Sequence, residues 1–152
     1  MKCVGVRHKP EHKNIFWFLV PELLEPITQI GSQVICDTKK GETTGVVMSI
    51  LEGIDFEEEN IKNFFKDMIL KKVIATQTKF NLADIHIPLD MERSSPSSDK
   101  IAKRVDEFYG TGSFKTPIIC SPDGNLQDGY TAYLVAKMFG HDTLTVFCVN
   151  QS

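Results

Sequence analysis

The alternation of apolar and polar positions in the first third of the chain is typical of short β-strands. The segments KCVGVRH and NIFWFLV are rich in β-branched and aromatic residues, and the polar stretch between them suits a strand connection. Two further runs, SQVICDT and TTGVVMSIL, flank the Gly-containing link Lys39-Lys40-Gly41-Glu42, which predicts a hairpin. Four or five such strands predict a small β-barrel over residues 1–52, because closure removes exposed sheet edges.

After residue 52 the apolar spacing changes to that of a helix. Acidic residues fill the start of the segment DFEEENIKNFFKDMILKKV and two lysines end it, an order that complements the helix dipole. We therefore expect a connecting helix within residues 53–80. Its apolar face would consist of Ile61, Phe64, Phe65, Met68 and Ile69.

From residue 81 to the end, strand and helix patterns alternate. ADIHIPLD, TPIICSPDGN and DTLTVFCVN are expected to be strands, and the last part of the second leads into a Pro-Asp-Gly turn. SSPSSDKIAKRVDEFYG is expected to be a helix that Ser97 or Ser98 caps and Gly110 ends, and DGYTAYLVAKMFG a second helix that Gly140 ends. The whole chain is then of the α+β class, with a barrel followed by an α/β domain at residues 81–152.

The sequence Asp128-Gly129-Tyr130-Thr131 stands where a strand turns directly into a helix. Such a turn directs the unpaired N–H groups of the first helical turn toward open space, where the helix dipole also favours negative charge. Gly129 would let the backbone approach an anion closely, and Thr131 would add a hydroxyl donor. However, Asp128 is also a good N-cap, and its own carboxylate could take the anion's place. The segment therefore predicts either a phosphate site or an ordinary helix cap.

The order of signals in residues 83–149 resembles that of the ParB/sulfiredoxin-like superfamily, also called the ParB-like nuclease domain. A strand ending in Ile-Pro is followed by an Arg, a helix, a Gly-containing loop, Pro-Ile, and Leu-x-Asp-Gly-Tyr leading a helix. The resemblance implies that nucleotide phosphates (CTP, ATP or ADP, with Mg²⁺) bind at the Gly turn and at the polar stretch after the first strand. The residues concerned are Arg93, Ser94, Ser95, Asp128, Gly129, Tyr130 and Thr131.

This superfamily includes DNA partition proteins, nucleases, reductases of cysteine sulfinic acid and kinases of free serine. Thr131 and Ala132 stand where partition proteins place two arginines, so we expect weak nucleotide binding. Sulfiredoxins need a cysteine directly after the glycine, and Tyr130 stands there, so this resemblance does not extend to sulfinic acid reduction. The sequence favours a binding protein in a DNA-related process over an enzyme.

The alternatives are a nucleotide-dependent phosphotransferase, a nuclease, or a non-catalytic scaffold for protein contacts. Catalysis would need a base and a cationic clamp or a metal. The candidates are Glu92 and Asp128 as catalytic carboxylates, Arg93 as the clamp and Asp90 as a metal ligand.

In the barrel region, the pattern FxFxVP followed by IGSQVICDTKKGETTGVV resembles the small SH3-like or KOW-like barrel at the N-terminus of primosomal helicases. This resemblance implies a nucleic-acid surface at Lys39 and Lys40, with Phe16 and Phe18 on one face and Trp17 on the other. The alternative, which we favour, is that these aromatic residues fill the core.

Composition narrows the picture further. With 41% hydrophobic and 24% charged residues the chain is expected to fold, and a net charge of −3 excludes a uniformly basic nucleic-acid binder. No apolar run approaches the length of a membrane span, so we expect a cytoplasmic protein without a membrane partner. DNA or a nucleotide is the expected partner, and a homo-oligomer is compatible with the sequence.

The four cysteines each lie in an apolar, β-like stretch, which favours buried, reduced thiols over a metal site. A zinc site would have to recruit Cys3, His8, His12 and Cys36, without the paired cysteines that make such patterns strong.

Overall fold

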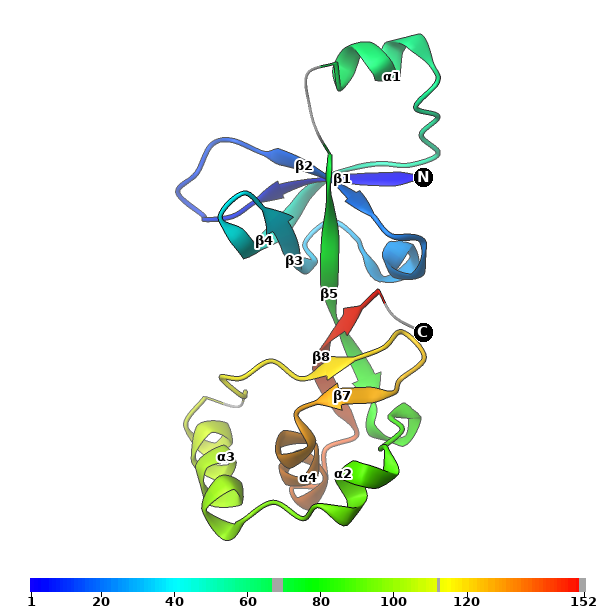
Figure 1. Cartoon of the computed structure of the whole chain (residues 1–152). Helices are drawn as coiled ribbons and strands as arrows, with labels where there is room; N and C mark the ends of the chain where they lie inside the picture. The colour runs from blue at the N-terminus through cyan, green and yellow to red at the C-terminus, as the bar shows by residue number, and fades with distance from the viewer. Residues whose placement is uncertain (67–69, 112, 151–152) are drawn as a thin grey trace. The chain divides into compact units, whose positions relative to one another are not determined.

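The computed structural model describes residues 1–66, 70–111 and 113–150 (Figure 1). The chain divides into two compact units, here called the N-terminal unit (Met1–Gln77) and the C-terminal unit (Thr78–Ser152). The long strand β5 (Lys71–Asn81) contributes residues to both.

The N-terminal unit is a closed five-stranded barrel, which confirms the predicted barrel and the α+β class. Its strands follow the order β2-β1-β4-β3-β5, and β2 also pairs with β5, in parallel, so that the ring closes. The first four strands are β1 (Lys2–Arg7), β2 (Phe16–Val20), β3 (Gln33–Thr38) and β4 (Gly41–Leu51). The hairpin predicted around Lys39 and Lys40 is present, with Asp37 paired to Glu42.

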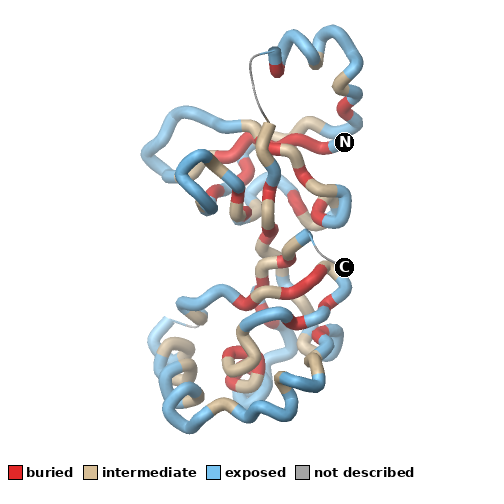
Figure 2. Tube along the Cα trace, in the orientation of Figure 1, coloured by how far each residue is buried: buried red, intermediate tan, exposed pale blue. Residues whose placement is uncertain are grey.

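Alternate residues are buried in β2, β3 and β4, whereas the five residues from Lys2 to Val6 of β1 are all buried (Figure 2). Lys2 is a charged residue among these mostly apolar buried positions, and it is only 4% exposed. Its Nζ donates to the carbonyl oxygens of Glu25, at 2.9 Å, and Thr28, and lies 3.2 Å from Oε1 of Glu52. Lys2 thus ties the short helix η1 (Glu22–Ile27) to the first strand.

The connecting helix is shorter than predicted. Helix α1 covers only Glu59–Phe64, and the prediction is wrong for residues 71–80, which belong to strand β5. Val73 and Ala75 are buried in alternation, and pairing with β3 and β2 outweighs the local helical pattern. Two of the residues expected on the helix face, Met68 and Ile69, lie outside the described residues.

The C-terminal unit is a small mixed sheet with helices. Strand β6 (Ile119–Cys120) runs parallel to β8 (Thr143–Val149) and antiparallel to β7 (Leu126–Asp128), in the order β5-β8-β6-β7. The two predicted helices are confirmed as α3 (Ser98–Thr111) and α4 (Tyr130–Met138). Ser97 caps α3 as expected, through its Oγ and the N–H of Lys100 at 3.3 Å.

Three local expectations in this unit are wrong. Residues 83–90 form no strand beyond an isolated bridge at His86, because the 3-10 turn η2 (Leu82–Asp84) and helix α2 (Leu89–Arg93) interrupt them. Pro88 occupies the N-cap of α2, where a proline cannot extend a ladder. Gly110 lies within α3 rather than ending it, and strand β7, three residues long, was not predicted.

Helices α3 and α4 pack against each other (Figure 1). Helix α4 is the inner one, with buried residues Ala132, Tyr133, Val135 and Ala136, whereas α3 has no buried residue among those described (Figure 2). Helix α3 therefore leaves most of its polar side chains accessible to a ligand.

Candidate functional site

The backbone at the start of α4 requires a glycine. Gly129 has φ 97° and ψ 27°, in the left-handed region that side chains disfavour. A Cβ at this position would lie 3.0 Å from Cγ1 and 3.2 Å from Cα of Ile118. The tight approach of the turn to β6 explains why the sequence reads Asp-Gly here.

No side chain in the described part of the chain caps the N-terminus of α4. Oδ1 of Asp128 accepts the N–H of Gly129 at 2.9 Å, and not an N–H of the first helical turn. The first helical bond runs from the N–H of Tyr133 to the carbonyl of Gly129, at 3.0 Å. The N–H groups of Tyr130, Thr131 and Ala132 precede it and have no partner within the helix. The aspartate cap, one of the two alternatives left by the sequence, is therefore not formed in the described residues.

The residues that carry these N–H groups line a groove of about 840 Å³, here called the α3–α4 groove. Its walls are α2 with the following loop, one face of α3, Thr116 and the turn that begins α4. The lining residues are Asp90, Met91, Ser94, Ser95, Pro96, Ser97, Lys100, Lys103, Arg104, Thr116, Asp128, Gly129, Tyr130, Thr131 and Ala132.

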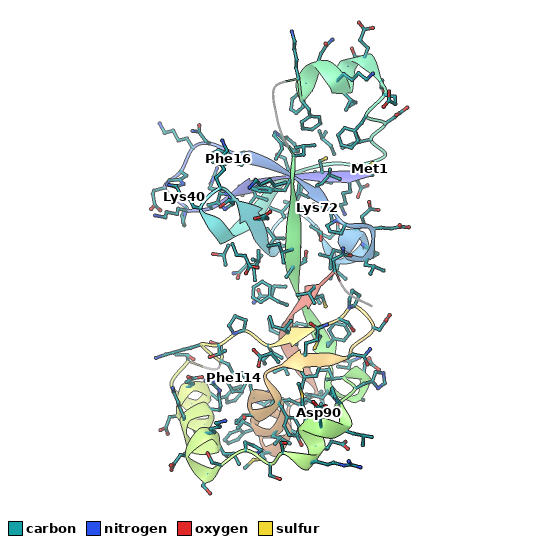
Figure 3. The ribbon with its side chains drawn as sticks, viewed as in Figure 1. Met1, Phe16, Lys40, Lys72, Asp90 and Phe114 are labelled. Carbon is teal, nitrogen blue, oxygen red and sulfur yellow. The ribbon has the colours of Figure 1, made fainter. Side chains whose placement is uncertain are left out.

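The structure brings most of the sequence-predicted site residues together in this groove. Ser94 and Ser95 reach it from the loop after α2, and the four residues from Asp128 to Thr131 reach it from the turn. Asp90, labelled in Figure 3, lines it from α2. Arg93 and Glu92 also lie on α2, but they are exposed and do not line the groove.

Sequence reasoning missed the cations of the groove, which come from α3. Lys103 lies three residues after Lys100 and Arg104 lies four residues after it. Both are therefore neighbours of Lys100 on the same side of the helix. The signal was present in the segment DKIAKR, but only the fold shows that this face meets the start of α4. The lining of the groove thus combines these three cations with the carboxylates of Asp90 and Asp128.

Arg104 forms an ion pair with Glu107 and is less exposed than Lys100 and Lys103. Its Nη1 lies 2.9 Å from Oε1 and 3.0 Å from Oε2 of Glu107, and the two side chains are 23% and 10% exposed. Oε2 of Glu107 also accepts the N–H of Lys115, at 3.4 Å. Burial raises the pKa of Glu107, but the hydrogen bonds from Arg104 and Lys115 outweigh it, and the net pKa is lowered.

Only some of the barrel residues that the resemblance implied for nucleic-acid contact are exposed. Lys39 and Lys40 are exposed at the hairpin, and Phe16, 50% exposed, lies 5.7 Å from the ring of His8 (Figure 3). Phe18 is only 5% exposed, so it belongs to the core, as the favoured alternative predicted, and not to an open aromatic face. Trp17 points to the other face, as expected, and packs on Phe64 and Phe65 of the α1 region at 5.7 and 6.2 Å.

All four cysteines are buried and free of disulfides. Burial raises the pKa of Cys36 and Cys120 to about 12 and that of Cys3 and Cys148 to about 11. Thiols with such pKa values are poor nucleophiles at neutral pH. Across residues 1–66, 70–111 and 113–150, no cluster of three or more His, Cys, Asp or Glu side chains has the geometry to hold a metal ion.

The helices of the described residues are too short or too polar to cross a membrane. No protein-family model and no curated protein matches the sequence. Among solved structures, the C2221 form of a Pnob8-like ParB-N domain is similar, with 15% sequence identity and a TM-score of 0.45. The similarity covers 51% of this chain and 31% of that one, so this chain matches about a third of the other's length.

Proposed function

We propose that the C-terminal unit binds the phosphate groups of a nucleotide or of a nucleic acid in the α3–α4 groove. The observation that carries this proposal is that two sources of positive potential line the same α3–α4 groove. The uncapped start of α4 offers backbone N–H donors, and the facing side of α3 offers Lys100, Lys103 and Arg104.

These two sources suit a phosphate better than a carboxylate or a neutral ligand. Several N–H donors and at least two cations can each bond a different oxygen of a di- or triphosphate. The hydroxyl groups of Ser94, Ser95 and Thr131 line the same space and can donate to the remaining oxygens. Only one arginine lines the groove as a planar fork, so we expect modest affinity.

Tyr130 favours a nucleotide over free phosphate. Tyr130 lines the groove, and its ring stacks on that of Tyr133, with centroids 6.4 Å apart and planes 17° apart. A supported aromatic ring next to a phosphate seat gives a nucleobase a surface for stacking. The resemblance of residues 83–149 to ParB/sulfiredoxin-like proteins selects CTP, ATP and ADP, with and without Mg²⁺, as the first ligands to test, and a DNA-related process as the context.

Thermal unfolding of the full chain tests the proposal, because a ligand that binds only the folded state raises the Tm. We expect CTP or ATP to raise the Tm, and pyrophosphate to do so less. Gly129→Val should abolish this shift and Lys100→Glu should reduce it, while Lys39→Ala in the barrel retains it. Tyr130→Ala should weaken the nucleotide shift but not that of pyrophosphate. A wild-type Tm unmoved by all of these ligands would refute the proposal.

A second binding surface is proposed on the barrel. Phe16 is half exposed with His8 beside it, and Lys39 and Lys40 are exposed on the neighbouring hairpin of the same unit. Exposed aromatic rings and lysines are the usual contacts to single-stranded nucleic acid. If the barrel binds DNA, affinity should fall with salt, and Lys39→Glu with Lys40→Glu should reduce both the affinity and its salt dependence.

Catalysis in the groove is the alternative reading. Asp90 and Asp128 both line it, whereas Glu92 does not, so a phosphotransferase or nuclease would draw its carboxylates from the first two. Hydrolysis of ATP or of DNA in the presence of Mg²⁺, lost in both Asp90→Asn and Asp128→Asn, would favour this reading over simple binding.

A further inference from the structure

The cations of the α3–α4 groove differ in how firmly they are held. Within the described residues, neither Lys100 nor Lys103 forms an ion pair, and both are exposed. Arg104 has one nitrogen, Nη1, on both oxygens of Glu107. Its other guanidinium nitrogens form no hydrogen bond or ion pair with the described residues, and Arg104 lines the groove.

The same carboxylate reaches a second wall of the groove. Oε2 of Glu107 accepts the N–H of Lys115, and the next residue, Thr116, also lines the groove. Phe108 and Phe114 reinforce this link, with ring centroids 5.3 Å apart. One side chain therefore fixes both the guanidinium and the segment that carries Thr116.

We propose that Glu107 is a positioning residue, which holds Arg104 and the 115–116 segment in the geometry that receives a ligand phosphate. The proposal rests on the proposed function of the groove. A free arginine side chain must lose much rotamer freedom to bind a ligand, and one that a carboxylate already holds loses less. Because the net pKa of Glu107 is lowered, the carboxylate stays ionised throughout the neutral range.

Removal of the carboxylate has opposite effects under the two available explanations. If Glu107 only neutralises charge or supports the fold, Glu107→Gln adds one positive charge to the groove and should strengthen anion binding. If Glu107 positions Arg104, the same substitution weakens binding in spite of the added charge. The sign of the change thus separates the two roles.

The test is calorimetric titration of the full chain with CTP, ATP and pyrophosphate, for wild type, Glu107→Gln, Arg104→Ala and the double variant. We expect Glu107→Gln to lose roughly five- to tenfold in affinity, in line with a charge-assisted hydrogen bond. In the Arg104→Ala background, Glu107→Gln should change affinity by less than about twofold, since coupled residues are non-additive. Glu107→Asp, which keeps a carboxylate, should recover part of the loss.

Thermal unfolding without ligand accompanies each variant, so that a loss of fold is recognised as such. Equal or tighter binding by Glu107→Gln, or the same loss in the wild-type and Arg104→Ala backgrounds, would overturn the positioning role while leaving the groove as the binding site. An absence of binding in the wild type itself would overturn the proposed function and this inference together.

Discussion

Gly129 and Ile118 are in such close contact that a Cβ on the glycine would lie 3.2 Å from Cα of Ile118, a backbone atom that cannot move aside. The turn before α4 is therefore held against strand β6, and the first N–H groups of the helix keep a fixed direction. This packing positions the candidate site, because the residues that carry those N–H groups line the groove.

Gly129→Ala should destabilise the protein by roughly 1–3 kcal/mol, since it combines a left-handed backbone with a close contact. Gly110→Ala is the matched control: this glycine lies within α3, and a Cβ there would meet no atom within 4 Å. The control should stabilise the protein by about 0.5–1 kcal/mol. Urea unfolding of both variants measures the difference, and equal effects would argue against the constrained turn.

Charge reversal on α3 should weaken phosphate binding without loss of fold. Lys100→Glu and Lys103→Glu change exposed side chains, so thermal stability should stay within about 0.5 kcal/mol of wild type. Each should reduce the affinity for ATP roughly tenfold at low salt, and less at high salt, because screening weakens the remaining attraction. The same reversal at Lys39, on the barrel, should leave ATP binding unchanged. If Lys39→Glu weakens ATP binding as much as Lys100→Glu, the site is not the groove.

Lys2 should prove to be a structural lysine. Lys2→Met leaves the carbonyl oxygens of Glu25 and Thr28 without this donor inside the barrel, a loss of about 1–3 kcal/mol. The comparison variant is Lys62→Met, whose ion pair with Glu57 is exposed and should contribute less than about 1 kcal/mol. Chemical denaturation that showed similar losses for the two would disprove the role of Lys2.

The buried thiols should lower stability at high pH. Their pKa values are raised in the folded state, to about 11 for Cys3 and Cys148 and about 12 for Cys36 and Cys120. The folded state therefore keeps protons that the unfolded state releases above roughly pH 8.5, and stability falls as pH rises from there toward the folded values. Replacement of Cys36 with alanine or serine should flatten this decline between pH 9 and 11 in thermal unfolding. An unchanged slope would contradict the assignment.

Local sequence signals predicted the elements whose formation depends on neighbouring residues in the chain. The hairpin at Lys39-Lys40, the N-cap at Ser97 and the end of α4 near Gly140 were all readable from turn and cap residues. Strand β5 could not be predicted in this way. Residues 71–76 form a strand because they pair with β3 and β2, and the local sequence gives no sign of this pairing.

The candidate site shows the same division. The Asp128-to-Thr131 turn was predicted because its glycine and the following helix are adjacent in sequence. Lys100, Lys103 and Arg104 were read only as the polar face of a helix, since their role depends on which other element that face meets. Arg93 was singled out by resemblance, yet its short helix turns it away from the groove lining.

The most direct test of the central claim is a nuclear magnetic resonance titration of the full chain with ATP and with pyrophosphate, followed through the backbone amides. We predict the largest shifts at the N–H groups of Tyr130, Thr131 and Ala132, with smaller shifts along α3 at Lys100 and Lys103. Shifts confined to the barrel, or an unchanged spectrum at saturating ligand, would contradict the claim that the start of α4 receives a phosphate.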